Sequence, residues 1–504
     1  MNTTYDLRAA RLRECPDVPG LPAQYRNDLR QIFNVWRAKL PRNIMRSRYY
    51  NGHEVVKNLG IAIPPDFAAT VDSVVGWPQK AVDSLASVSR FDAFIGSDVA
   101  MGILDEVTEA TDFYDKYDMM VPSELTHSCA AVTLSAGLDG LPQMNAHSAI
   151  TAGLLWSYER NRVKCGCTVA RIDEYGNVLA YNLYEDDAVV VIWRIDRTQT
   201  EWGFYVLPHA MGRPLIEPFV YGKSLDRPFG VSRINREVMS ITDDAMRAAL
   251  RMEIGAEFFT SPQKVLLGAP DGIFPQPESE AVEAIDEETG EPVEGYDEYD
   301  DPPIRRALDA QTAWEYYIGH VMAIGRDENG NIPQLVQVSP TSMEPHIATL
   351  RALASRFAGA TGVPLNELGI VQDNPSSAEA INASREPLIR EANKLNTSNG
   401  RSLRTVGQMA VAIALNKPLS ALTPEERDIR THFMDPDRPS MVSRADALSK
   451  LAAAAPAFAK TRVFWEKAGL TDDQIDIVMA AQKQQDGAES FANLLAGVAN
   501  GTRE

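Results

Sequence analysis

Two pairs of residues in this 504-residue sequence have types that could do redox, metal or nucleophilic chemistry. Cys165-Gly166-Cys167 contains half of a metal-binding or redox motif, but no second Cys/His pair lies at zinc spacing. Alternation along a strand puts both thiols on one face, so buried packing is the favoured interpretation. His127-Ser128-Cys129 contains a base and a nucleophile, but the sequence identifies no third group that would orient the base, and packing is again favoured.

Two acidic pairs, Asp186-Asp187 and Asp243-Asp244, could ligate magnesium as in a nuclease. Their surroundings contain no supporting constellation, so solvated turns or helix faces are the favoured interpretation. The pattern G-x-x-x-x-G-K-[ST] is absent, which excludes ATP hydrolysis by the P-loop route. We therefore predict no catalytic residue, no metal and no cofactor. A metal-dependent hydrolase or nuclease with unrecognised acidic sites remains the alternative function.

A polar loop at 361–376 lies between two predicted helices, 342–360 and 377–415. Gly359, Gly362 and Pro364 end the first helix, and a capping-box pattern from Ser376 to Glu379 opens the second. The loop is predicted to be pinned at both ends and free in the middle. Without Lys or Arg it can contact phosphates only weakly or pack against other copies of itself. Its candidate contact residues are Pro364, Leu365, Asn366, Glu367, Leu368, Gln372, Asp373 and Asn374.

The helix predicted from 377 to 415 has one apolar stripe and one basic face. At 100° per residue its other basic side chains lie within about 40° of Arg390, on either side of it. An ordinary solvated face is favoured over a dedicated DNA-facing stripe. Pro387 lies inside the pattern and predicts a kink. The possible guide stripe for DNA consists of Arg390, Lys394, Arg401 and Arg404.

The segment 278–301 holds twelve acidic residues and no basic one. It cannot bury a core, so we predict a mobile or loosely ordered surface loop that a basic partner could neutralise. Its representative acids are Glu287, Glu288, Asp297, Glu298, Asp300 and Asp301.

The pattern of the remaining chain predicts helices on both sides of a strand-rich block. Helices are expected in 20–60, 66–90 and 98–155, and five or six antiparallel strands between Val163 and Phe219. A helix follows from Ser232 to about Phe259. Short strands are expected at 262–268 and 335–338, and short helices after 415.

Composition limits the functional classes. The length suits several domains or one elongated subunit, and the net charge of −20 excludes a basic nucleic-acid clamp. Four scattered cysteines predict no disulfide framework. The first fifteen residues have no apolar core typical of a signal peptide, and no run of about eighteen apolar residues exists to span a membrane. We expect a soluble protein that is assembled inside a cell.

Eight short motifs together resemble one family through their order and spacing over about residues 40–485. The likeness is to the portal protein, or head-to-tail connector, of long-tailed double-stranded DNA bacteriophages. The motifs are Tyr49-Tyr50-Asn51-Gly52, Val74-Val75-Gly76-Trp77, Gly230-Val231-Ser232-Arg233-Ile234, Ser261-Pro262-Gln263-Lys264-Val265-Leu266-Leu267-Gly268, Phe357-Ala358-Gly359-Ala360-Thr361-Gly362-Val363-Pro364, Asn374-Pro375-Ser376-Ser377-Ala378-Glu379-Ala380, Arg444-Ala445-Asp446-Ala447-Leu448-Ser449-Lys450 and Gly469-Leu470-Thr471-Asp472-Asp473.

The resemblance implies an α+β subunit with wing, stem, clip and crown, mostly α-helical with a β-rich wing portion and a small α/β clip, assembled as a ring. The implied parts are a wing at 1–230 with strands from about 162, stem helices at 231–260 and 342–360, a clip at 261–341, a tunnel loop at 361–376, a kinked wing helix at 377–420 and a crown at 421–504. The acidic segment 278–301 departs from the family pattern.

The resemblance further implies a non-enzymatic conduit for DNA during genome packaging and ejection, located at one capsid vertex of the virion and in the host cytoplasm during assembly. The implied partners are eleven further copies in a dodecamer, double-stranded DNA, the major capsid protein, scaffolding protein where present, the large terminase and the head–tail adaptor. No membrane is implied.

Overall fold

The computed structural model describes residues 14–53, 73–137, 140–195, 201–260, 264–267, 334–337, 342–370, 378–437, 441–470, 474–475 and 477–484. The chain divides into two compact units. The first comprises Met1–Tyr50, Gln79–Asn235 and Thr361–Glu504, and the second comprises Asn51–Pro78 and Arg236–Ala360. Each unit is therefore assembled from segments that are distant in the sequence.

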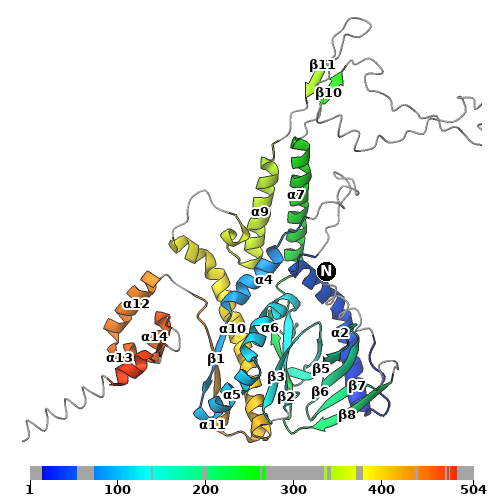
Figure 1. Cartoon of the computed structure of the whole chain (residues 1–504), viewed down its shortest axis with the longest axis vertical. Coiled ribbons are helices and arrows are strands. Elements are labelled where there is room, and N and C mark those ends of the chain that lie inside the picture. The colour runs from blue at the N-terminus through cyan, green and yellow to red at the C-terminus, as the bar shows by residue number, and fades with distance from the viewer. Residues whose placement is uncertain are drawn as a thin grey trace, which may run out of the picture. The chain divides into compact units, whose positions relative to one another are not determined.

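The described elements of the first unit are helices and antiparallel strands (Figure 1). Its helices are α2 (Ala23–Tyr50), α4 (Trp77–Val88, which begins in the second unit), α5 (Asp98–Ala110), α6 (Phe113–His127), η1 (Leu365–Leu368), α10 (Ala378–Ala414), η2 (Leu419–Ala421), α11 (Pro424–Arg427), α12 (Met441–Ala454), α13 (Pro456–Ala459) and α14 (Arg462–Ala468). Its strands are β1 (Phe91–Gly96), β2 (Cys129–Ala136), β3 (Pro142–Ser148), β4 (Ala152–Ser157), β5 (Arg162–Ile172), β6 (Val178–Tyr184), β7 (Ala188–Arg194), β8 (Trp202–Pro208), β9 (Ile216–Val220) and β12 (Ile429–Phe433).

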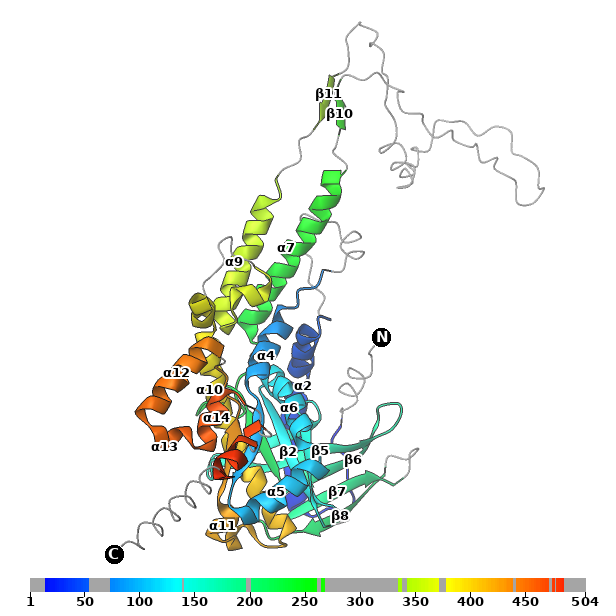
Figure 2. The ribbon, with the colours of Figure 1, turned by 60° about the vertical axis from the view of Figure 1, so that its left-hand side comes forward.

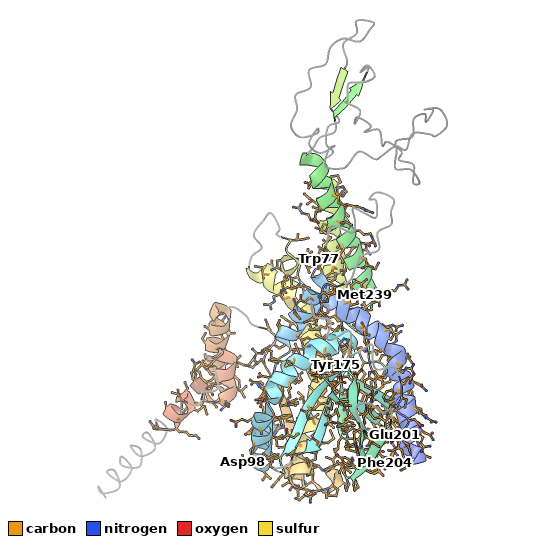
Figure 3. All side chains as sticks on the ribbon, turned by 45° about the vertical axis from the view of Figure 1, so that its right-hand side comes forward. Trp77, Asp98, Tyr175, Glu201, Phe204 and Met239 are labelled. Atoms are coloured by element: carbon orange, nitrogen blue, oxygen red, sulfur yellow. The ribbon has the colours of Figure 1, made fainter. Side chains whose placement is uncertain are left out.

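A five-stranded antiparallel sheet with the order β4-β5-β6-β7-β8 forms one core with α2. The predicted apolar face of α2 supplies Ile32 and Phe33, both fully buried, and Trp36. The ring of Phe33 lies edge-on to Tyr181 of β6, and Phe204 of β8 packs at the margin of this core (Figure 3). Burying each such side chain contributes about 1.5–3 kcal/mol, so α2 and the sheet stabilise each other.

A three-stranded sheet with the order β3-β2-β9 packs against α6 and α10. The pair β1–β12 joins residues 91–96 to 429–433 and contacts α10. α5 begins at Asp98 (Figure 3), where the Ser97 hydroxyl accepts a hydrogen bond from the Ala100 N–H at 3.3 Å. Together these contacts surround the C-terminal half of α10 with strands.

The second unit contains two helices that lie side by side in both views, α7 (Arg236–Thr260) and α9 (Glu344–Thr361), whose last residue belongs to the first unit (Figures 1 and 2). Phe357 of α9 is fully buried, and its ring lies 5.4 Å from that of Trp77. The antiparallel strands β10 (Lys264–Leu267) and β11 (Gln334–Gln337) also belong to this unit.

Several predicted elements are confirmed. These are the helix within 20–60, the helix from about 232 to 259, both helices flanking 361–376, the five antiparallel strands between 163 and 219, and the short strands near 262–268 and 335–338. The mixture of helices and antiparallel sheets confirms the α+β class. Among the residues with a described placement, no helix is both long enough and apolar enough to cross a membrane.

One prediction of secondary structure is wrong, and one pair of strands was not predicted. Residues 98–155 are helical only as far as His127, and three strands follow, β2, β3 and β4. β2 buries five consecutive side chains, so its sequence lacks alternation and matches a buried helix equally well. The strands β1 and β12 were not predicted, because each is short and pairs with a partner more than 300 residues away.

Candidate functional site

The polar loop predicted at 361–376 begins beside a buried arginine, Arg233, which lies between β9 and α7. A tight turn brings Arg233 into the core: the Val231 N–H donates to the Tyr221 carbonyl at 3.1 Å. Gly230 in this turn has a φ of +70°, and a Cβ there would lie 1.9 Å from the same carbonyl oxygen. Only glycine fits this position.

The Arg233 guanidinium joins four segments of the first unit. Nε donates to the Ala81 carbonyl at 2.6 Å, and Nη2 donates to the Thr361 carbonyl at 2.6 Å. Nη1 lies 2.6 Å from Oε1 of Glu391 on α10. Tyr221 completes the cluster, since Nη1 donates to its hydroxyl at 3.2 Å and the hydroxyl donates to Glu391. We call these three side chains and two carbonyls the Arg233 cluster.

The Arg233 cluster determines where α9 ends. Thr361 is the last residue of α9, and the final carbonyls of a helix have no partner within it. Arg233 satisfies the Thr361 carbonyl, and Gly362 follows with a φ of +69°, which favours glycine after a helix end. The start of the loop is therefore held by a buried charge and by backbone geometry.

The next residues of the loop are also attached to the first unit. Leu365–Leu368 form a single 3₁₀ turn, and Leu368 is buried. The Ser84 hydroxyl of α4 donates to Glu367 at 2.7 Å, and the Lys80 ammonium lies 3.4 Å from the same carboxylate oxygen. The prediction of a free interior is therefore wrong for Leu365–Leu368, because the side chains of Glu367 and Leu368 bind α4 and the core.

The other predicted loop residues, Gln372, Asp373 and Asn374, lie outside the described residues, as does the predicted cap at Ser376. The acidic segment 278–301, with its six representative acids Glu287, Glu288, Asp297, Glu298, Asp300 and Asp301, also lies outside them.

The predicted basic stripe on α10 is exposed, but its four members differ. Arg390 lies 3.5 Å from Glu386 one turn earlier, and Lys394 and Arg401 are exposed. Arg404 uses its Nε to donate to the Ile429 carbonyl of β12 at 2.7 Å. Arg404 therefore has a structural role, because it links α10 to β12. Pro387 lies inside α10, which continues through it, and the kink stays a prediction.

The residues first considered for catalysis are engaged in structural contacts. Both ring nitrogens of His127 have hydroxyl partners, Ser47 at 2.8 Å and Ser123 at 3.1 Å, so neither nitrogen is left to activate Cys129. Burial and the nearby Arg46 lower the pKa of His127 to about 4. Asp186 pairs with Arg160. In the other acidic pair, Oδ1 of Asp244 lies 2.5 Å from Nη2 of Arg247.

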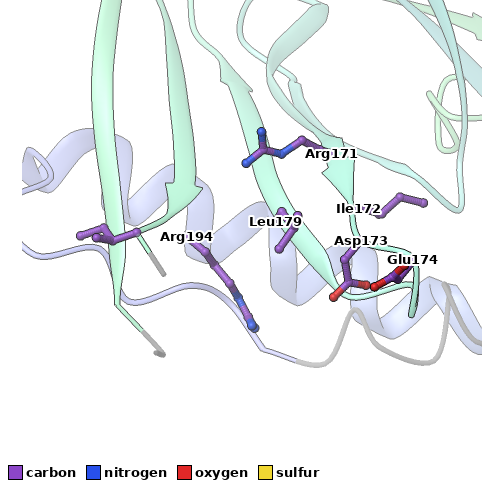
Figure 4. Close-up of a pocket in the computed structure, with 7 residues that line it drawn as sticks. Arg171, Ile172, Asp173, Glu174, Leu179 and Arg194 are labelled. Atoms are coloured by element: carbon purple, nitrogen blue, oxygen red, sulfur yellow. The ribbon is translucent and has the colours of Figure 1, made fainter. Parts of the chain in front are cut away.

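One pocket of about 390 Å³ lies at the end of the five-stranded sheet (Figure 4). Its polar side chains serve local structure: both carboxylate oxygens of Asp173 accept hydrogen bonds from Asn177, and Arg194 lies over the ring of Trp202 at 5.2 Å. The lining contains no histidine, cysteine, serine or threonine that could act as a base or nucleophile.

Comparison with known proteins defines the class. A family model described as "Phage portal protein, SPP1 Gp6-like" matches residues 29–489. Because that match covers most of the chain, the chain belongs to the phage portal protein family. The portal protein of Mycobacterium phage L5 is 25% identical over 461 residues, covering 86% of this chain and 84% of the relative. The portal protein of Mycobacterium phage D29 is 25% identical over 446 residues, covering 85% and 82%.

Solved structures give two further similarities. A chain in a structure described as "Virion of native gene transfer agent (GTA) particle" has a TM-score of 0.42 and 13% identity, and the alignment covers 87% of this chain and 93% of that one. A chain in "Neck of native GTA particle computed with C12 symmetry" has a TM-score of 0.40 and 13% identity, with coverage of 83% and 94%.

Sequence reasoning noticed Arg233 only as part of a motif and did not notice Glu391 at all. The available signal was the pair of glycines, Gly222 and Gly230, on either side of a turn before an apolar helix. That pattern indicates a close backbone approach, but it does not indicate which distant carbonyls the arginine binds.

Proposed function

We propose that this chain is the ring-forming portal at the unique vertex of a phage capsid, through which double-stranded DNA passes during packaging and ejection. The observation that carries the proposal is the portal family match over residues 29–489. The ring has twelve subunits, and the particle is a virion whose portal is assembled in the host cytoplasm. The chain acts as a conduit and docking platform without enzymatic activity.

The parts of the subunit follow from this function. α7 and α9 are the stem helices, residues 261–341 the clip, residues 361–376 the tunnel loop, and α10 the spine of a wing that also includes residues 1–230. Residues 421–504 form the crown. The terminase motor docks first and head–tail adaptors later, while the outer surface meets the major capsid protein and any scaffolding protein. The acidic segment 278–301 lies on the clip and receives a basic partner.

The channel guides DNA without a sequence-specific grip. Duplex DNA carries about one negative charge per 1.7 Å, and a strongly basic bore would hold it through counterion release. The net charge of −20 argues against such a bore. Exposed Arg390, Lys394 and Arg401 act as weak guides within a Debye length of about 8 Å.

The tunnel loop acts as a valve that resists backward slippage, with its first half as a fixed base. Support comes from the attachment of Thr361 to Arg233 and of Glu367 to Ser84 and Lys80. Thr361, Glu367 and Leu368 are therefore held against the first unit.

Electron micrographs of the purified chain test the proposed assembly. We expect closed rings with a central hole wide enough for duplex DNA, and only weak, salt-sensitive binding of short duplexes. A compact monomer would contradict the portal assignment, and tight sequence-specific binding at physiological salt would contradict the sliding conduit.

Phage particles carrying altered loops test the valve. Replacing Leu365–Asp373 with a short Gly/Ser linker should preserve rings and reduce packaged DNA. Glu367→Ala should reduce packaged DNA by less, because it removes only the contacts of Glu367 with Ser84 and Lys80. Glu386→Ala, which removes an exposed carboxylate paired with Arg390, is the matched control and should package normally. Normal packaging by the linker variant would refute the valve.

A further inference from the structure

A cluster of three metal-ligating side chains lies in the core between α2 and the five-stranded sheet. Asp28 comes from α2, Cys165 from β5, and Glu185 from the turn between β6 and β7. One ligand atom from each lies within 4.8 Å of the other two. Asp28 is 5% exposed, Cys165 0% and Glu185 4%. Two carboxyl groups and a thiol are thus concentrated where water has little access.

Glu185 has an unsatisfied buried oxygen. Its Oε1 is buried and has no hydrogen-bond partner among the described residues. The adjacent acid, Asp186, pairs with Arg160, and the Asp187 carbonyl accepts from the His209 N–H at 2.7 Å. A buried polar oxygen without a partner is costly, on the order of 1–3 kcal/mol, and such atoms in folded proteins call for an explanation, of which a bound ion is one.

The cluster already attracts one cation. The Lys164 ammonium lies 2.5 Å from Oδ1 of Asp28, while its side chain is 45% exposed. Lys164 therefore reaches the cluster from solvent on a flexible stem, and its ammonium donates a hydrogen bond to Asp28. Within the described part of the chain, no hydrogen bond reaches Glu185 Oε1.

We propose that Asp28, Cys165 and Glu185 form a binding site for a divalent zinc ion. Zinc accepts this mixture of thiolate and carboxylate ligands, with Zn–S near 2.3 Å and Zn–O of about 2.0–2.2 Å. Those bond lengths place tetrahedral ligand atoms about 3.5 Å apart. Side-chain rotations that draw the three atoms about 1 Å closer complete the site, and a water molecule or a second carboxylate oxygen occupies the fourth position.

Charge balance favours a divalent ion. Binding releases the protons of the Cys165 thiol and the Glu185 carboxyl to solvent, because both groups ligate as anions. Three anionic ligands then face one Zn²⁺ and the Lys164 ammonium, so the buried site is neutral. A hard ion such as Mg²⁺ suits the site less, since it prefers six oxygen ligands and a thiolate is a poor substitute.

The site would stabilise the β-rich part of the first unit. Its ligands belong to three segments that are separated by up to 157 positions, from Asp28 to Glu185. A metal that binds only the folded chain adds RT ln(1 + [Zn]/Kd) to the free energy of unfolding. The ion therefore acts as a cross-link between α2, β5 and the β6–β7 turn.

Cys167 provides a matched control. It is as buried as Cys165, lies two residues further along β5 and belongs to the same apolar core. It is not part of a group of three metal-ligating side chains among the described residues. Replacing either cysteine by serine makes the same chemical change in the same strand.

The full-length chain, purified and dialysed against micromolar zinc and then against buffer, should retain about one zinc per chain by elemental analysis. Cobalt(II) added to metal-free protein should give a thiolate-to-cobalt charge-transfer band in the near ultraviolet. Cys165→Ser should abolish the band and the retained zinc, Glu185→Gln should weaken zinc affinity at least tenfold, and Cys167→Ser should retain both signals.

Two outcomes would overturn the site. Wild-type protein that retains no zinc and gives no cobalt band refutes it without any variant, so the test survives a Cys165→Ser chain that does not fold. A band that persists in Cys165→Ser and disappears in Cys167→Ser, Cys15→Ser or Cys129→Ser would assign the metal to another thiol. Ring assembly is scored separately by microscopy, so its failure does not affect this result.

Discussion

The long helix α10 takes part in two buried polar clusters that handle charge in opposite ways. Eight residues apart, Glu391 pairs with Arg233, while Asn399 donates from Nδ2 to Glu124 of α6 at 2.8 Å. Arg233 uses all three guanidinium nitrogens and stays charged. In the second cluster, Glu124 Oε1 and Asn399 Oδ1 have no hydrogen-bond partner among the described residues.

In the second cluster, burial favours the protonated form of Glu124. Glu124 is fully buried, and desolvation raises its pKa to about 8, although the hydrogen bond from Asn399 opposes the shift. No cation is paired with it in the described part of the chain, so the neutral acid is the stable form in the folded state at neutral pH. The comparison teaches that a buried charge persists where several segments supply counter-groups, and that an acid without them keeps its proton.

The largest expected effect is the loss of Arg233. Arg233→Met should lower the free energy of unfolding by about 3–5 kcal/mol, because it leaves two buried carbonyls without a donor and Glu391 without its cation, with only the Tyr221 hydroxyl among the described residues bonded to it. Arg233→Lys keeps the charge but has a single nitrogen, so an intermediate loss is expected. Urea denaturation of the purified chain measures both.

Arg390→Met on the exposed side of α10 is the control for that measurement and should change stability by at most about 0.5 kcal/mol. Equal losses for Arg233→Met and Arg390→Met would show that the Arg233 cluster contributes no more than an exposed pair.

The Glu124 cluster should make stability depend on pH. Its folded pKa of about 8 lies above the ordinary value of 4.5, so the folded chain holds a proton that the unfolded chain has released. The contribution of this proton to the free energy of unfolding is complete below pH 4.5. It is lost as the pH rises toward 8, and the free energy of unfolding then falls by up to about 1.4 kcal/mol per pH unit. Glu124→Gln should remove this share of the slope.

The pH dependence is measured as the difference in slope between wild type and Glu124→Gln from pH 5 to 8. Glu185 also has a pKa raised to about 8, chiefly by burial, and in the metal-free chain it adds its own slope to both proteins. Glu185→Gln is therefore the matched comparison. A slope that Glu124→Gln leaves unchanged would mean that Glu124 is ionised in the folded chain.

The two clusters also mark what could be predicted from sequence. The apolar period of α2, α7, α9 and α10 is local, so the existence of these helices was predicted, and the bounds of α9 and α10 were predicted to within two residues. The partners of Arg233 lie up to 158 positions away, from Ala81 to Glu391, and no periodic pattern links them. Glu124 occupies a helix position that sequence alone would assign to a solvated face.

The loop 361–376 shows the same limit. Gly362 and Pro364 predict its start correctly, because they act through local backbone geometry. The attachment of Glu367 to Ser84 depends on a contact across 283 positions. The β2 strand was not predicted for another reason: its five consecutive buried side chains show no periodic pattern.

A smaller effect is expected at the base of the loop. Ser84 is buried and donates to Glu367, so Ser84→Ala should cost about 1 kcal/mol, the net value of one hydrogen bond. Ser87→Ala is the matched control, because Ser87 is exposed and donates only to the Ser84 carbonyl within its own helix. Thermal unfolding separates the two, and an equal loss would contradict the anchoring of Glu367 by Ser84.

The smallest effect on stability is expected for the exposed cations of α10, and here the comparison is with α2. Lys394→Gln with Arg401→Gln, and Arg30→Gln with Arg37→Gln, each remove two exposed positive charges and should each change stability by less than about 0.5 kcal/mol. If the α10 cations meet DNA, the first pair should reduce the slope of log K against log salt for duplex binding to assembled rings by about 2, and the α2 pair should leave it unchanged. Equal slopes for both variants would show that the basic face of α10 is an ordinary solvated surface, the interpretation that its sequence pattern first favoured.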